Sequence, residues 1–132
     1  MVRKRIAKVT MDSVAKYTQR VRARRHEWHA DEPTTMGGAD AGPAPYELLL
    51  SALGACTVIT LQMYAERKGW ELGDVHLEMS FFKDGDEDRI ERTLRFGAEL
   101  TTAQHERLLE IADKTPVSKT VMAGSAISTR LA

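Results

Sequence analysis

The sequence is poor in cysteine, since Cys56 is the only one among 132 residues. A single cysteine cannot form an intrachain disulfide, which excludes a disulfide framework and agrees with a reducing compartment. The most apolar stretch, residues 48–64, is interrupted by serine, glycine, threonine and glutamine, so it falls short of a membrane span. The N-terminal residues also lack an apolar run of signal-peptide length. We therefore predict a cytoplasmic protein with no membrane partner.

An excess of charge of either sign is also missing, because 19 Lys and Arg residues balance 19 Asp and Glu. The distribution is uneven: residues 1–30 carry nine basic residues against Asp12 and Glu27. Such a basic segment could contact phosphate groups, but it could equally pair with an acidic strand of the same fold or of a dimer partner. Because no recognised nucleic-acid motif accompanies the charge, we predict no nucleic-acid partner.

Cofactor motifs are absent as well. The glycines at 37, 38 and 42 lack the Gly-Lys-Ser/Thr ending of a phosphate-binding loop. His26 and His29 are three residues apart in a predicted strand and would therefore point to opposite faces, which disfavours a metal site. We predict neither a metal nor a bound cofactor.

What is present is ordinary for one soluble domain: 42% hydrophobic and 29% charged residues. We treat residues 1–132 as a single domain. Alternation predicts strands over 4–11 and 16–26 around a turn at Asp12 and Ser13, with strand character continuing to about residue 30. A loop rich in glycine and proline follows.

Pro45 and Glu47 suit the first turn of a helix, and Gly69 is expected to end it near residue 68. A second hairpin is predicted over 75–82 and 89–96 around the polar residues 84–88. Thr101 is a candidate cap for another helix, which residues 114–116 end or kink, and 126–131 read as a last strand. This order predicts an α+β fold with antiparallel sheets.

Apolar residues go nearly all the way round the helix predicted over 47–68, so we expect a long, buried central helix. One domain of this length could hardly surround such a helix. A partner subunit that covers part of it is the simplest remedy, which predicts a homodimer.

Cys56 lies inside this helix, where a cysteine is commonly an inert filler. A reactive thiol would need a nearby cation, for which an arginine is the natural choice, and Glu47 could orient it. Glu47 and Cys56 are nine residues apart, which separates them by about 13 Å along the helix and places them on opposite sides. If both serve one site, that site is shared between two subunits.

These residues resemble the central region of the OsmC/Ohr family, the osmotically induced and organic hydroperoxide resistance proteins. Residues 37–57 and 63–70 carry the resemblance, above all through the spacing from Pro-Tyr-Glu-Leu-Leu to Ala-Cys. Residues 25–33, 88–91 and 108–112 are similar to the OsmC-like branch of the family. The resemblance implies an OsmC-like fold, assembled as an intertwined homodimer that reduces organic hydroperoxides.

The resemblance also implies roles for individual residues. Cys56 would be the peroxidatic cysteine and Glu47 would orient an arginine against it, for which Arg25 is our choice and Arg24 the alternative. The family's second cysteine normally stands in a Cys-Pro-Val-His pattern, but this chain has Thr115-Pro-Val-Ser118. The usual disulfide cannot form, so an external thiol would have to reduce oxidised Cys56.

Two functions remain open from the sequence. The first is a one-cysteine, thiol-dependent peroxidase that defends against organic hydroperoxides. The second is a non-catalytic protein of the same fold, in which the dimer interface binds a small apolar ligand and Cys56 serves packing or sensing. The loss of cysteine at 115 favours the second, whereas the context of Cys56 favours the first.

Overall fold

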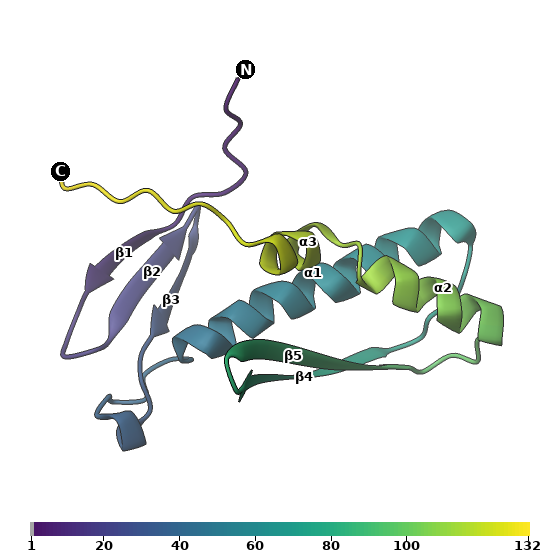
Figure 1. Ribbon diagram of the computed structural model, residues 1–132, viewed down its shortest axis with the longest axis horizontal. Helices are drawn as coiled ribbons and strands as arrows, with labels where there is room; N and C mark the ends of the chain where they lie inside the picture. The colour runs from purple at the N-terminus through teal and green to yellow at the C-terminus, as the bar shows by residue number, and fades with distance from the viewer. Residues whose placement is uncertain (1) are drawn as a thin grey trace. The chain divides into compact units, whose positions relative to one another are not determined.

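The computed structural model describes residues 2–132, which form two compact units, one ending at Leu49 and the other running from Leu50 to Ala132. The N-terminal unit contains a three-stranded antiparallel sheet in the order β1-β2-β3, made of β1 (Thr10–Ser13), β2 (Gln19–Ala23) and β3 (His26–Ala30) (Figure 1). A short 3₁₀ helix, Thr34–Met36, follows.

The turns of this sheet differ from those that the sequence predicts. Asp12 and Ser13 belong to β1, and the chain turns over residues 14–18, where the Val14 N–H donates to the Thr18 carbonyl at 3.0 Å. Strand structure does not cover residues 2–9. The predicted strand 16–26 is broken as well, because Ala23 pairs with His26 across a two-residue turn in which Arg24 adopts a positive φ of 54°.

Asp31 organises the loop after β3. Its buried carboxylate accepts hydrogen bonds from the Thr18 hydroxyl at 2.7 Å, the Glu32 N–H at 2.7 Å and the Ala41 N–H at 3.2 Å. The Thr18 hydrogen bond is the largest influence on the pKa of Asp31 and lowers it, and it outweighs burial, which acts in the opposite direction. The loop therefore closes around a carboxylate that is held in its charged form.

We expect Asp31→Asn to lower the melting temperature by several degrees at neutral pH, because an amide nitrogen cannot accept from Thr18 and Ala41. The lowered pKa means that this stabilisation is complete above the unfolded value of about 3.9 and is lost as the pH falls through the folded one. Thermal melts from pH 7 to pH 2 should therefore show the melting temperatures of the wild type and of Asp31→Asn converging at low pH. Asp40→Asn, at an exposed position of the same loop, is the control.

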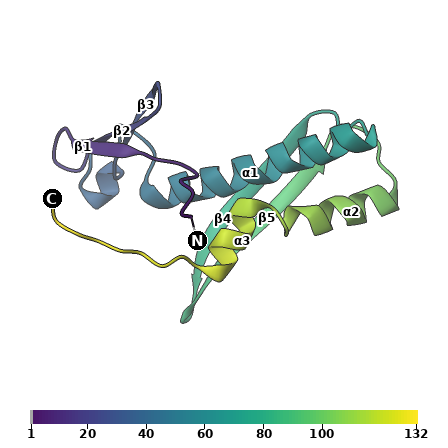
Figure 2. The same ribbon diagram turned by 90° about the horizontal axis from the view of Figure 1, so that it is seen from above.

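The second unit packs helices on a hairpin (Figures 1 and 2). Helix α1 (Pro45–Lys68) begins in the N-terminal unit and continues through the second, followed by β4 (Val75–Asp84), β5 (Glu87–Phe96), α2 (Thr102–Ala112) and α3 (Pro116–Ala123). The core joins α1 to α2 through buried Leu61, Ala65, Leu72 and Leu108. Helices and antiparallel hairpins in this order confirm the predicted α+β class.

Local sequence signals mark several boundaries correctly. Thr101 caps α2 in a capping box with Gln104, whose N–H donates to the Thr101 hydroxyl at 3.1 Å. Helix α2 ends at Ala112 with Asp113 as its C-cap, and Thr115 caps a separate helix, α3, that the sequence did not reveal. The last strand predicted over 126–131 is wrong, because residues 124–132 have no regular secondary structure and no strand of the described chain pairs with them.

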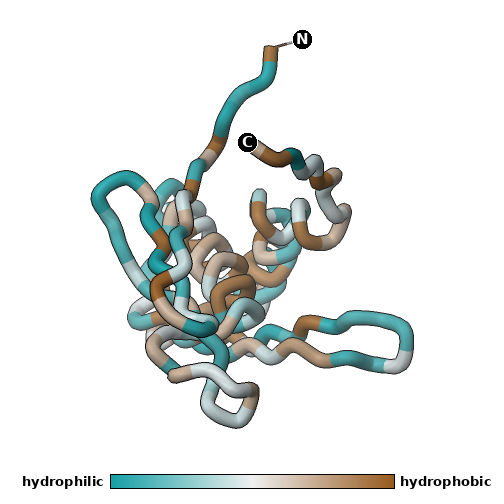
Figure 3. The backbone as a smooth tube through the Cα atoms, turned by 90° about the vertical axis from the view of Figure 1, so that its left-hand side faces the viewer, coloured by the Kyte–Doolittle hydropathy of each residue, from teal (hydrophilic) through white to brown (hydrophobic). Residues whose placement is uncertain are grey.

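Figure 3 colours the backbone by hydropathy and shows brown, hydrophobic stretches within its helical coils. Helix α1 is rich in apolar residues, yet the chain covers only one side of it. Buried positions on this helix are Leu53, Gly54, Thr57, Leu61 and Ala65. On its uncovered side Ile59 is 48% and Met63 59% exposed. Among residues 2–132 it is also the one helix long and apolar enough to cross a membrane. This is weak evidence for a membrane span, because core helices of soluble proteins can have the same length and composition.

Candidate functional site

Cys56 is a free, half-buried cysteine in the middle of α1. Its Sγ lies 4.0 Å from the Thr60 hydroxyl, one helical turn further on. The next residue, Thr57, is completely buried, and its hydroxyl donates to the Leu53 carbonyl at 2.7 Å. The thiol therefore stands at the edge between the covered and uncovered sides of the helix.

Glu47 lies in the first turn of α1 and is exposed. Its Oε1 accepts the Ala44 N–H at 2.8 Å, so the carboxylate helps to begin the helix. Both Glu47 and Cys56 belong to α1, and nine helical residues place them on opposite sides of it. The helix itself does not bring the two together, as the sequence predicts.

Arg25, the predicted thiolate partner, lies in the β2–β3 turn of the N-terminal unit and is exposed, as is Arg24. Arg20 in β2 differs from both, since its Nε is buried and has no hydrogen-bond partner within residues 2–132. A buried donor of this kind is usually satisfied by a further group or by an ordered water.

Arg92 is a polar centre of the second unit that the sequence reading missed. From β5 its Nη1 donates to the Thr57 hydroxyl and to the Ser118 hydroxyl, both at 2.9 Å. Its Nη2 lies 3.1 Å from the Asp113 carboxylate, which is itself 75% exposed. The arginine side chain is only 18% exposed, so one guanidinium joins β5, α1 and α3 in a largely buried setting.

Two further hydroxyls complete this network. Thr115 and Ser118 are buried, and their hydroxyl oxygens lie 2.6 Å apart. The Ser118 hydroxyl also approaches the Ala112 carbonyl at 3.1 Å, at the end of α2. Hydrogen bonds between these hydroxyls and Arg92 thus connect β5 with α1 and α3.

A signal for Arg92 does exist in the sequence. Inward positions of β5 alternate with outward ones, and Ile90, Leu94 and Phe96 are the apolar members of the half-buried set. Arg92 interrupts this apolar face with a charge. A charged residue at such a position needs buried partners, although the pattern does not say which.

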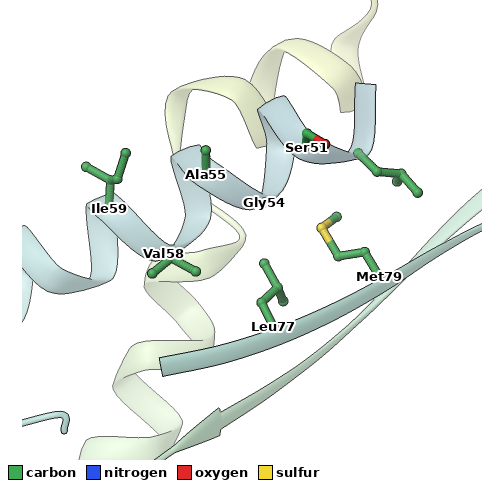
Figure 4. Close-up of a pocket in the computed structure, with 8 residues that line it drawn as sticks. Ser51, Gly54, Ala55, Val58, Ile59, Leu77 and Met79 are labelled. Carbon is green, nitrogen blue, oxygen red and sulfur yellow. The ribbon is translucent and has the colours of Figure 1, made fainter. Parts of the chain in front are cut away.

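An apolar pocket of about 450 Å³ lies between α1 and β4 (Figure 4). Helix residues on one side and two strand residues on the other form its wall: Leu50, Ser51, Gly54, Ala55, Val58, Ile59, Leu77 and Met79. Gly54 allows the close approach, because a β-carbon there would lie only 3.1 Å from the Met79 sulfur. Cys56 does not line this pocket.

The position of Cys56 follows from helix geometry. Each residue turns the helix by about 100°, so residues 56 and 58 lie on opposite flanks of Thr57. Val58 lines the pocket at β4. The thiol therefore faces away from this apolar pocket.

Comparison with known proteins places these features in a family. The family model described as "OsmC-like protein" matches residues 37–130, which include Cys56, Arg92 and the Thr115–Ser118 segment. None of the curated proteins matches the sequence.

Solved structures share the fold. A putative osmotic stress induced and detoxification response protein from Psychrobacter arcticus is 16% identical with a TM-score of 0.78, over 91% of each chain. An OsmC-like protein from Mycoplasma pneumoniae is 16% identical with a TM-score of 0.77, over 92% of this chain and 89% of that one. The organic hydroperoxide resistance protein OhrB of Bacillus subtilis is 21% identical with a TM-score of 0.60, over 87% and 89%. These neighbours and the family match confirm the predicted OsmC-like fold, and the chain belongs to the OsmC-like protein family.

Proposed function

We propose that the protein reduces organic hydroperoxides through Cys56. The observation that carries this proposal is a free, half-buried cysteine at the centre of α1, inside the region that matches the OsmC-like family. Structural neighbours named for organic hydroperoxide resistance, from Legionella pneumophila and Bacillus subtilis, support this choice of substrate class.

The reaction begins with attack of the Cys56 thiolate on the terminal oxygen of the hydroperoxide. A sulfur–oxygen bond forms while the oxygen–oxygen bond breaks, which oxidises the sulfur by two electrons and reduces the peroxide by two. The leaving alkoxide takes up a proton and departs as an alcohol. Cys56 is left as a sulfenic acid.

Recycling requires reducing equivalents from outside the chain, because the sequence has no second cysteine. One external thiol condenses with the sulfenic acid to form a mixed disulfide and water. A second thiol then displaces Cys56 and restores its thiol. Without such a reductant, excess hydroperoxide would drive Cys56 to the irreversible sulfinic acid.

The proposed site includes a partner subunit. Glu47 and an arginine of the N-terminal unit would assist Cys56 in a homodimer, since Glu47 cannot reach the thiol of its own helix. Arg25 is the arginine predicted from the sequence. Arg20 is the stronger candidate, because it holds a buried donor without a partner in residues 2–132.

The proposed dimer can be tested separately at the uncovered side of α1. Ile59→Asp should convert the dimer to a monomer, because it places a charge on the uncovered apolar side of α1, where Ile59 is 48% exposed in the single chain. Light scattering at micromolar concentration measures the mass. Leu109→Asp is the matched control, since Leu109 is an equally apolar residue of α2 that is 60% exposed. A wild-type monomer would contradict the proposal of a shared site.

Turnover tests the function itself. Purified protein is mixed with an alkyl hydroperoxide and either a dithiol or glutathione, and loss of hydroperoxide is followed against a sample without protein. We expect many turnovers per Cys56 with at least one of these thiols. If no hydroperoxide is consumed with either thiol, the peroxidase proposal is wrong.

A further inference from the structure

We propose that Arg92 is a positioning residue for Cys56, an inference that rests on the proposed function of that thiol. The guanidinium would fix the turn of α1 that carries the cysteine. Its Nη1 holds the Thr57 hydroxyl at 2.9 Å, and Thr57 follows Cys56 directly in the helix.

Arg92 connects this turn of α1 to α3 through hydrogen bonds. The same Nη1 holds Ser118 at 2.9 Å, and Ser118 is in turn close to Thr115 at 2.6 Å and to the Ala112 carbonyl at 3.1 Å. Thr57, Thr115 and Ser118 are buried, so water does not replace these partners when one of them is removed. The network therefore anchors α1 to the start of α3 at the level of the thiol.

The Asp113 contact contributes little to this anchoring. Its carboxylate is 75% exposed, and an ion pair in that setting is screened by solvent. The two buried hydroxyls carry the geometric constraint, because a single guanidinium nitrogen donates to both of them. A lysine at this position keeps the charge but offers no planar fork to hold both hydroxyls together.

Reaction with a hydroperoxide demands alignment of sulfur with the oxygen–oxygen bond, whereas alkylation by iodoacetamide demands little beyond exposure of the thiol. The two rates should therefore move in opposite directions when the anchor is lost. We expect Arg92→Met to slow Cys56 oxidation by an alkyl hydroperoxide at least about tenfold. The same variant should speed alkylation at least about threefold, through local opening of the helix contacts.

Arg107→Met is the matched control. Arg107 also ties a neighbouring helix to α1, because its Nε donates to the Tyr64 hydroxyl at 3.0 Å, about two helical turns beyond Cys56. This variant should leave both rates within about twofold of wild type, since the anchor at Thr57 is intact. Arg92→Lys should fall between wild type and Arg92→Met in both rates.

A second variant, Ser118→Ala, tests the same anchor. If Arg92→Met does not fold, Ser118→Ala removes one partner of the same nitrogen and should shift both rates in the same directions by a smaller factor. If wild-type Cys56 is not oxidised by hydroperoxide at all, the proposed function fails, while alkylation still reports on the anchor. Equal shifts in the Arg92 and Arg107 variants, or unchanged rates in both Arg92 variants, would overturn the positioning role.

Discussion

Cys56→Ser should abolish hydroperoxide turnover, with a fall on the order of 10³-fold or more to the rate of the uncatalysed reaction. Serine matches the shape of cysteine, but its hydroxyl is a poor nucleophile towards peroxide oxygen. The chain has no other cysteine that could take over the reaction. The measurement is the consumption of alkyl hydroperoxide with an external thiol in excess.

A control at the neighbouring turn separates loss of the thiol from disturbance of the helix. Thr60→Val removes the hydroxyl that lies 4.0 Å from the Cys56 sulfur but leaves the thiol in place. We expect this variant to keep its turnover within a few-fold of wild type. Full activity in Cys56→Ser would show that the chemistry belongs to another group and would contradict the role proposed for Cys56.

The second large effect concerns stability. Leu108→Ala should lower the free energy of unfolding by about 2–5 kcal/mol, since it leaves a cavity in the core where Leu108 is fully buried against Leu61 and Leu72. Leu109, the next residue in α2, is 60% exposed. Leu109→Ala should cost less than about 0.5 kcal/mol.

Urea denaturation of the two variants measures this difference, and an unchanged dependence on urea concentration would show that only the folded state has lost stability. Because the two leucines are adjacent in one helix, their helix propensities and sequence context are matched. Equal losses for both variants would mean that the core of the second unit is not the one described.

Features with local causes were predictable from the sequence. The hairpin of β4 and β5 follows from alternation around a turn, which the structure narrows to Gly85 and Asp86 between the paired residues Asp84 and Glu87. The beginning of α1 at Pro45 and the cap of α2 at Thr101 follow from the preferences of the first helical turn.

Features that depend on contacts between distant parts of the sequence were not predictable in this way. Arg92 finds its partners 35 residues before it and 26 residues after it in the sequence, and no periodic pattern encodes such a pairing. The turn after β2 was missed because arginine rarely adopts the positive φ that Arg24 has. The strand predicted over 126–131 failed because alternation marks a strand only where a partner strand is present.

The candidate site divides in the same way. Cys56 and Glu47 stand out in the sequence because their spacing in one helix carries the family pattern, and their roles stay predictions. The supporting arginine does not stand out, since Arg20, Arg24 and Arg25 are close together in the sequence and burial is what distinguishes Arg20 from the other two. The network at Thr115 and Ser118 appears only once α3 is folded against β5.

Reaction of Cys56 with a hydroperoxide changes the mass of the peptide that contains it. The protein is treated with one equivalent of an alkyl hydroperoxide in the absence of thiols, and sulfenic acid is then trapped with dimedone before digestion. We expect stoichiometric trapping at Cys56 and none in Cys56→Ser. An unmodified Cys56, recovered as a free thiol while the hydroperoxide is intact, would contradict the role proposed for this residue.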